Sequence, residues 1–280
     1  MTVPGTWKGK ASSTATRGRR FRLRMALADV VEGALLWPHW FTLGNIDIKL
    51  RFRRTGLGPI WTTLSFSVLA LALGVVYGAV FQEDVASYLP YVVVGLFVWG
   101  WLATTLTEAC EAFIHAEPIL KQLYVARTTL IYRGLWRNLV LLGFNFAAVA
   151  IVLVACRVTL PASAPLALAG LALLLVNLAW LSLLLALATT RYRAISRIVQ
   201  TALPIGMLVT PVIWRPLTPR LAEFAAINPL FHAVELVRGP LLASPPGAAT
   251  WLGAAAVAAM GSVAAFFIFA AARPRIPYWL

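Results

Sequence analysis

The sequence predicts an all-α, polytopic membrane protein, and two observations support that fold class. Hydrophobic residues make up 60% of the 280 residues, whereas charged residues make up only 12%. A soluble domain of this length has about half apolar and about a quarter charged residues. The apolar residues also collect in long runs, as bilayer-spanning helices require. The net charge of +14 does not indicate nucleic-acid binding, because the basic residues gather between these runs.

The first 35 residues are expected to form a basic cytoplasmic tail, followed by a transmembrane domain over residues 36–280. Seven Lys and Arg residues precede residue 25. Asp29 and Glu32 interrupt the apolar residues that follow, so the segment lacks the uninterrupted core of a signal peptide.

Residues 36–54 are expected to form an amphipathic helix at the inner membrane interface. Residues 46–53 alternate apolar and polar as in a strand, but a lone strand would leave its backbone groups unpaired. A helix pairs its own backbone groups and can lie in the interface. At helical spacing, six residues share one face: Trp37, Trp40, Phe41, Gly44, Ile48 and Phe52.

Six apolar segments follow, each near the roughly 20 residues that cross a bilayer. The predicted transmembrane helices are residues 60–81, 88–107, 138–156, 165–190, 198–214 and 250–272. In the first of them, Ala70, Gly74 and Gly78 form a ridge of small residues at a spacing of four. Such a ridge lets another helix approach closely, either within the chain or between two copies.

The distribution of basic residues predicts that both termini are cytoplasmic. With the amino terminus inside, 20 of the 24 Lys and Arg residues fall in inner segments. Basic residues are retained on the cytoplasmic side of a membrane, so this orientation is favoured strongly over its inverse.

Two polar interruptions of the pattern have possible functions. Between the second and third spans, Glu117-Pro118 precedes a short helix that is either a solvated connector or a docking helix for a cytoplasmic partner. Before the last span, residues 221–242 are apolar but interrupted at Asn228-Pro229 and Gly239-Pro240, so neither half can span. We expect re-entrant outer helices there, placed as a lid over the outer mouth of a pathway.

The sequence contains no metal-ligand cluster, phosphate loop or nucleophile elbow. The spans carry almost no central ionisable residue of the kind that proton- or sodium-coupled carriers use. Glu108 and Glu111 lie at an inner helix end, where they are expected to face water or basic neighbours. The chain is therefore expected to depend on an energy source supplied by another protein.

Four short motifs in order carry a family resemblance. They are Arg51-Phe52-Arg53-Arg54-Thr55 with Leu57-Gly58-Pro59 and Trp61, then Arg191-Tyr192-Arg193, then Thr210-Pro211-Val212, and finally Asn228-Pro229-Leu230 with Arg238. With these motifs on a six-span frame, the chain resembles the permease subunit of ATP-binding-cassette polysaccharide exporters. That class exports lipid-linked O-antigen, capsule, teichoic acid and mycobacterial-type galactan. The basic segment before Phe21 departs from the shorter starts usual in the family.

The resemblance implies a homodimer in a bacterial plasma (inner) membrane, bound to two copies of a cytoplasmic ATPase subunit. ATP and Mg would bind that partner, so this chain would be a transport subunit, without enzymatic activity or a cofactor. It also implies that Glu117–Arg127 is the coupling helix, with contacts from Glu117, Leu120, Lys121, Gln122, Tyr124 and Arg127. The outer gate would include Asn228, Pro229, Phe231 and Arg238.

A lipid-linked glycan has a diphosphate and sugar rings, and each suggests candidate residues. The candidates for binding the diphosphate are Arg51, Arg53 and Arg54, because one guanidinium group can donate two parallel hydrogen bonds to phosphate oxygens. In the alternative, these arginines only fix the orientation of the chain in the membrane. Aromatic faces can stack on sugars, and the candidates to line the channel are Tyr77, Tyr88, Tyr91 and Trp99. The alternatives for these four are an interfacial belt and internal packing.

Two other functions remain open at this stage. One is an ATP-driven permease for a small hydrophobic solute or drug. The other is a membrane enzyme acting on lipid-linked sugars, which would need an acidic or histidine cluster at a membrane face. Glu83-Asp84 is the only adjacent acidic pair in the sequence.

Overall fold

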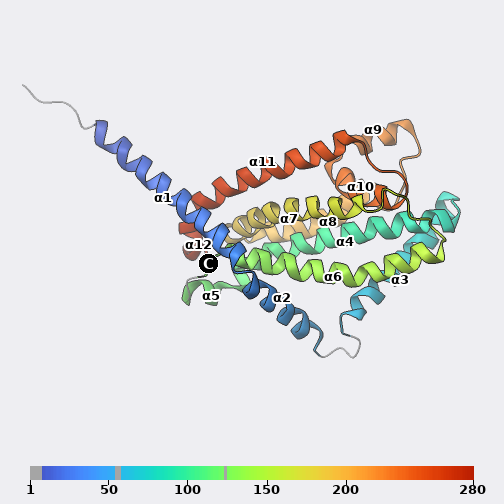
Figure 1. Cartoon of the computed structure of the whole chain (residues 1–280), viewed down its shortest axis with the longest axis horizontal. Helices are drawn as coiled ribbons and strands as arrows, with labels where there is room; N and C mark the ends of the chain where they lie inside the picture. The colour runs from blue at the N-terminus through green and yellow to red at the C-terminus, as the bar shows by residue number, and fades with distance from the viewer. Residues whose placement is uncertain (1–7, 54–57, 123–124) are drawn as a thin grey trace, which may run out of the picture.

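The chain forms a bundle of long helices with shorter helices at both ends (Figure 1). The computed structural model describes residues 8–53, 58–122 and 125–280, with side chains from residue 20 onward. No strand occurs within these ranges, which confirms the all-α class. The helices are α1 (Lys8–Leu35), α2 (Trp37–Phe52), α3 (Ile60–Phe81), α4 (Val85–His115), α5 (Glu117–Gln122), α6 (Thr128–Ala155), α7 (Leu166–Arg191), α8 (Ala194–Val209), α9 (Pro219–Ile227), α10 (Pro229–Leu241), α11 (Ala248–Ala272) and α12 (Ile276–Trp279), with a 3-10 turn η1 (Arg273–Arg275) before α12.

Five helices of the described chain are long and apolar enough to cross a membrane: α3, α4, α6, α7, and α11 with its continuation into α12. The segment predicted as the fifth of six spans, residues 198–214, differs from expectation. Its helix α8 has 16 residues and ends at Val209. Thr210 is extended, with φ −87° and ψ 137°, because the ring of the following Pro211 disfavours helical backbone before it. The six-span arrangement therefore stays a prediction.

Helix α4 is the centre of the bundle and packs against α3, α6, α7, α8 and α10. Small residues allow these close approaches. A Cβ on Gly74 would lie 2.3 Å from Leu89 of α4, and a Cβ on Gly170 of α7 would lie 2.2 Å from the Leu236 carbonyl of α10. The small-residue ridge of α3 is thus used for packing within the chain.

The second half of α1, expected as part of a tail, is a helix docked on the bundle. Its carboxylate Asp29 is buried and accepts hydrogen bonds from the Thr128 backbone N–H at 3.2 Å and from Arg273 Nε at 2.8 Å. Asp29 thereby joins α1 to the start of α6 and to the end of α11. Helices α1, α5 and α12 lie at one end of the bundle, near the carboxyl terminus, and helices α9 and α10 lie at the other end (Figure 1).

Residues 37–52 form the helix α2 rather than a strand, as predicted. Gly44, Ile48 and Phe52 of the predicted apolar face are buried. Trp40 and Phe41 pack against Trp136 of α6, with ring centroids 6.2 and 4.8 Å apart. This part of the face therefore contacts protein, and helix α2 is held against α6.

The segment of residues 221–242, expected to lie at the outer face, breaks at Asn228 as predicted. The Asn228 side chain accepts a hydrogen bond from the Leu230 N–H and caps α10, which begins at Pro229. The predicted second interruption at Gly239-Pro240 is wrong, because α10 continues through both residues to Leu241. Pro240 lies in the last turn of α10 and has no backbone N–H, so the helix lacks one hydrogen bond there. Insertion of these helices into the membrane stays a prediction.

Candidate functional site

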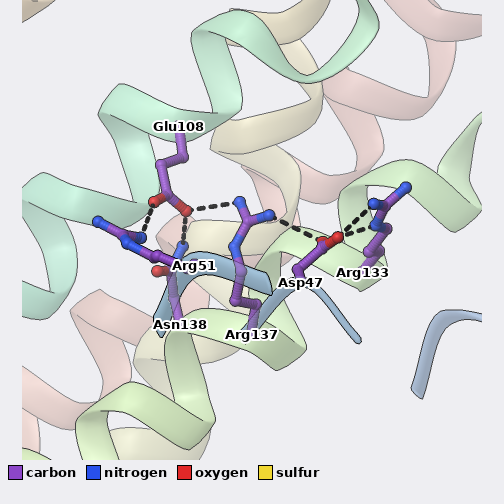
Figure 2. A network of polar contacts seen from close by, with 6 residues as sticks. All are labelled: Asp47, Arg51, Glu108, Arg133, Arg137 and Asn138. Carbon is purple, nitrogen blue, oxygen red and sulfur yellow. Dashed lines mark hydrogen bonds and ion pairs between the residues drawn. The ribbon is translucent and has the colours of Figure 1, made fainter. Parts of the chain in front are cut away.

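The end of the bundle that is expected to face the cytoplasm, called the inner end below, is organised around the carboxylate of Glu108, on the last turns of α4. Glu108 accepts hydrogen bonds from Arg51 of α2 at 2.9 Å, and from Arg137 and Asn138 of α6 at 2.6 and 2.9 Å (Figure 2). Each pairing with an arginine is also an ion pair. Three helices thus meet at one side chain.

Asp47 extends this network along α2. It accepts hydrogen bonds from Arg133 Nε at 2.7 Å and from Arg137 Nη1 at 3.0 Å, so Arg137 bridges the two carboxylates (Figure 2). The side chains of Arg133 and Arg137 are partly buried, and hydrogen-bonded ion pairs shielded from water are stronger than surface pairs. The network therefore fixes α2 against both α4 and α6.

A cavity of about 550 Å³ adjoins this network. Its lining includes Arg51, Glu108 and Arg137, together with Glu111 and His115 from the end of α4. Glu111 accepts a hydrogen bond from Ser196 Oγ of α8 at 2.6 Å. Glu108 thus has basic neighbours, as expected, whereas the hydrogen-bond partner of Glu111 is a serine.

The three arginines predicted to bind a diphosphate have different surroundings. Arg51 is paired with Glu108 and leaves 48% of its side chain exposed. Arg53 is exposed at the end of α2, and Arg54 lies outside the described residues. Their binding of phosphate stays a prediction.

The predicted coupling helix is shorter than Glu117–Arg127. Helix α5 ends at Gln122, and Val125 and Ala126 are not helical. Arg127 instead precedes α6 and pairs with Asp29 of the same chain at 3.7 Å, so the start of α6 is fixed there. Leu120 is buried in the core, whereas Lys121 and Gln122 are exposed. Tyr124 lies outside the described residues.

Glu117 and Lys121 form an ion pair one helical turn apart, at 2.7 Å. The hydrogen bond from Lys121, together with its charge, holds the pKa of Glu117 below its ordinary value. The carboxylate is therefore charged at neutral pH, and α5 presents a paired acid and base beside an exposed Ile119.

At the opposite end of the bundle, called the outer end below because it is expected to face away from the cytoplasm, a buried arginine organises the segment that follows α8. Arg238 of α10 is 1% exposed and donates to the carbonyls of Pro211 at 2.8 Å and Val212 at 3.2 Å. It also pairs with Glu235 and lies over the ring of Tyr91, 3.7 Å from the centroid. Residues after the end of α8 have no helical partners for their carbonyls, and Arg238 satisfies two of them.

Two tyrosines of α4 and the cap of α10 complete this outer cluster. The hydroxyl of Tyr91 donates to the carbonyls of Pro211 and Trp214, both at 3.1 Å, and that of Tyr88 donates to Ile213 at 2.6 Å. Asn228 donates to Thr210 Oγ1 at 3.0 Å. The structure therefore brings together Asn228, Arg238 and the Thr210-Pro211-Val212 motif. Pro229 is exposed, and Phe231 packs beside His232.

The four aromatic residues proposed to line a channel are not gathered around one space. Tyr88 and Trp99 are buried within the chain, where Trp99 contacts the Gly206 region of α8. Tyr91 belongs to the outer cluster, and Tyr77 lines a separate outer cavity of about 440 Å³. A channel role for them stays a prediction.

Sequence reasoning missed most of the inner network. The sequence pattern does not indicate a site formed by Asp47, Arg133, Arg137 and Asn138. Three of these four are charged residues close to apolar runs. The available signal was the pair of acids, Asp47 and Glu108, at helix ends surrounded by basic residues.

A family model described as ABC-2 type transporter matches residues 38–242, which is more than half of the chain. The chain belongs to the ABC-2 type transporter family. It is therefore a multi-pass membrane protein of that family. The match includes α2, α5 and the outer cluster.

Two curated relatives of this ABC-2 chain are O-antigen export system permease proteins RfbA from Klebsiella pneumoniae. They are 26% and 24% identical to it over 86 residues. Each match covers 31% of this chain and 33% of the relative, so the chain spans about a third of the length of the curated relatives it matches.

The burial of Arg238 gives a testable prediction about stability. Replacing Arg238 by Met leaves Glu235 and the Val212 carbonyl without their partner, and breaking a buried pair costs about 3–5 kcal/mol. We expect Arg238→Met to lower the thermal unfolding midpoint of the purified protein. Arg220→Met, at an exposed arginine of α9, is the matched control and leaves the midpoint unchanged. Equal midpoints for the two variants would contradict the assigned role of Arg238.

Proposed function

We propose that this ABC-2 chain is the permease of an exporter that moves a lipid-linked polysaccharide from the cytoplasmic to the outer face of a bacterial plasma membrane. Two copies would form the pathway, with two copies of the ATPase subunit on the cytoplasmic side. The similarity to the O-antigen export permeases carries the substrate class. The four sequence motifs shared with polysaccharide exporters support the same class.

The end of α2 is the proposed binding site for the diphosphate of the substrate. Arg53 is exposed there, and the half-exposed Arg51 lies beside it on the last turn. Guanidinium groups bind phosphate oxygens through paired, charge-assisted hydrogen bonds. A phosphate bound by Arg51 competes with Glu108 for the same guanidinium, so substrate binding would loosen the contact between α2 and α4.

Helix α5 is the proposed contact with the ATPase. Its exposed residues Ile119, Lys121 and Gln122 offer apolar and polar groups to a partner, while Leu120 anchors the helix to the core. Because α5 connects the ends of α4 and α6, a displacement of α5 would reach the inner network directly. ATP binding in the partner would thus be transmitted to Glu108 and α2.

The diphosphate proposal predicts the response of ATP hydrolysis to substrate. Replacing Arg51, Arg53 and Arg54 together by Gln removes the guanidinium groups, and each hydrogen bond to a charged group contributes about 1.5–3 kcal/mol. We expect the ratio of substrate-stimulated to unstimulated ATPase of the assembled transporter to fall to near one. The control is Arg197→Gln, at an exposed arginine of α8, which leaves the ratio unchanged.

Stimulation that persists in the triple variant would rule out the diphosphate role. Stimulation of the wild-type complex by small apolar solutes, with none by lipid-linked glycans, would instead favour a permease for hydrophobic solutes.

The coupling proposal predicts a defect in assembly. Lys121→Glu breaks the pair with Glu117 and gives the exposed face of α5 a net negative charge, so less ATPase subunit should copurify with the permease. Arg197→Glu changes charge by the same amount at another exposed inner position and should copurify normally. Normal assembly and normal coupled ATPase for Lys121→Glu would contradict the docking of α5.

A further inference from the structure

Helix α1 lies outside residues 38–242, the region matched by the family model, and its second half carries an exposed stripe. At helical spacing, five exposed residues share one face, called the α1 stripe below: Arg20, Arg24, Leu27, Val31 and Leu35. The three apolar members are 55%, 46% and 72% exposed. The opposite face, with Ala26, Asp29 and Gly33, is buried against the bundle. The α1 stripe therefore points away from the protein.

The buried face determines the depth of α1 relative to the membrane. Asp29 accepts a hydrogen bond from Arg273, the residue that directly follows α11. Helix α11 has 25 residues, which extend about 37 Å at about 1.5 Å per residue. The hydrocarbon core of a bilayer is about 30 Å thick. With α11 crossing the membrane, Arg273 lies at the level of the inner headgroups, and the part of α1 around Asp29 lies there with it.

The direction of α1 also suits a position at the membrane surface. Figure 1 shows α1 running obliquely across the end of the bundle, whereas the long helices run along it. Only Leu36 separates α1 from α2, and α2 exposes an apolar set at the same helical spacing, Leu43, Ile46 and Leu50. Exposed apolar residues thus continue from one surface helix into the next.

The positive charge of the α1 stripe is not neutralised by an acid of the described chain. Arg20 and Arg24 are exposed, and neither pairs with a carboxylate among the described residues. The two acids of this part of α1 are placed differently: Asp29 is buried and paired with other arginines, and Glu32 lies to the side of the stripe at helical spacing. The stripe therefore combines two available guanidinium groups with three exposed apolar side chains.

We propose that the α1 stripe binds the anionic phospholipid surface of the inner leaflet. Its apolar residues enter the boundary between headgroups and acyl chains, and its two arginines bind lipid phosphates. Helices that lie in the membrane interface combine exposed apolar and basic residues in this way. Guanidinium groups match phosphate oxygens, and anionic lipids give the cytoplasmic leaflet its negative charge. The proposal does not depend on the cargo of the transporter.

The experiment places a small fluorophore beside the α1 stripe of the full chain in nanodiscs. Ala34→Cys provides the labelling site, because Ala34 is exposed next to Leu27 and Val31 at helical spacing. Cys156→Ser removes the other accessible thiol, and Cys110 is buried. The quenchers are phosphatidylglycerol and phosphatidylcholine that carry a nitroxide on the acyl chain near the headgroup. We expect both lipids to quench the label, phosphatidylglycerol more strongly.

Two double variants test the role of the arginines. Arg20→Gln with Arg24→Gln should abolish the preference for phosphatidylglycerol, to which each arginine contributes about fivefold. Arg197→Gln with Arg220→Gln removes the same charge from exposed positions on α8 and α9 and should keep the preference. Equal thermal unfolding midpoints show that both variants are folded. A label at Ala194→Cys, at the exposed start of α8, is the reference site and should not be quenched.

Three results would overturn the lipid-binding role of the α1 stripe. The first is quenching at Ala34→Cys no stronger than at Ala194→Cys. The second is a preference for phosphatidylglycerol that persists without Arg20 and Arg24, or that the control variant loses equally. The third is a label that lipids never quench and that becomes protected from an aqueous quencher only when the ATPase subunit is added, which would assign the stripe to that partner.

Discussion

The packing of the inner half of the molecule depends on the ion pairs and hydrogen bonds of the Glu108 carboxylate. A charge at the end of an apolar helix is tolerated only when other groups satisfy it, and Glu108 has two arginines and an asparagine. Those donors come from α2 and α6, so satisfying one acid also fixes the interface helix against the bundle. The same contact places the exposed end of α2, the cavity and the short helix α5 within one connected region. Substrate binding and ATPase docking are proposed for the two ends of that region.

In the outer half, the groups that need hydrogen-bond partners are backbone carbonyls rather than a charged side chain. Helix α8 stops before Pro211, and the following carbonyls would be unpaired in an apolar surrounding. Arg238, Tyr91 and Tyr88 donate to them from α10 and α4. The outer helices are therefore locked to the central helix through polar contacts. A change in the tilt of α4 would alter the polar contacts at both ends of the bundle, because Glu108 and Tyr91 both lie on that helix.

The sequence was sufficient for features that depend on local pattern. The apolar runs predicted the class, the spacing of Gly44, Ile48 and Phe52 predicted a helix over a strand, and Asn228-Pro229 predicted a helix break. Contacts between residues that are far apart in the sequence could not be predicted from it. Asp29 meets Arg273, 244 residues away, and Asp47 meets Arg133, 86 residues away. No periodicity reports such pairs, because they are fixed by which helices become neighbours.

The same limit applies to the surroundings of single residues. The family resemblance implied a coupling helix over Glu117–Arg127, but α5 ends at Gln122, and Arg127 pairs with Asp29 of the docked helix α1. Tyr88 and Tyr91 donate their hydroxyls to carbonyls after α8, while their role in a channel stays a prediction. In both cases the residue has a long-range polar contact that the local sequence pattern does not report.

We propose that this chain is a pathway driven by a separate ATPase, with a lipid-linked glycan as its cargo. The most direct measurement is translocation of a labelled lipid-linked glycan across proteoliposomes that contain the permease with or without its ATPase subunit. We expect translocation only when both chains and hydrolysable ATP are present. Translocation by the permease alone, or none by the complete ATP-hydrolysing complex, would contradict it.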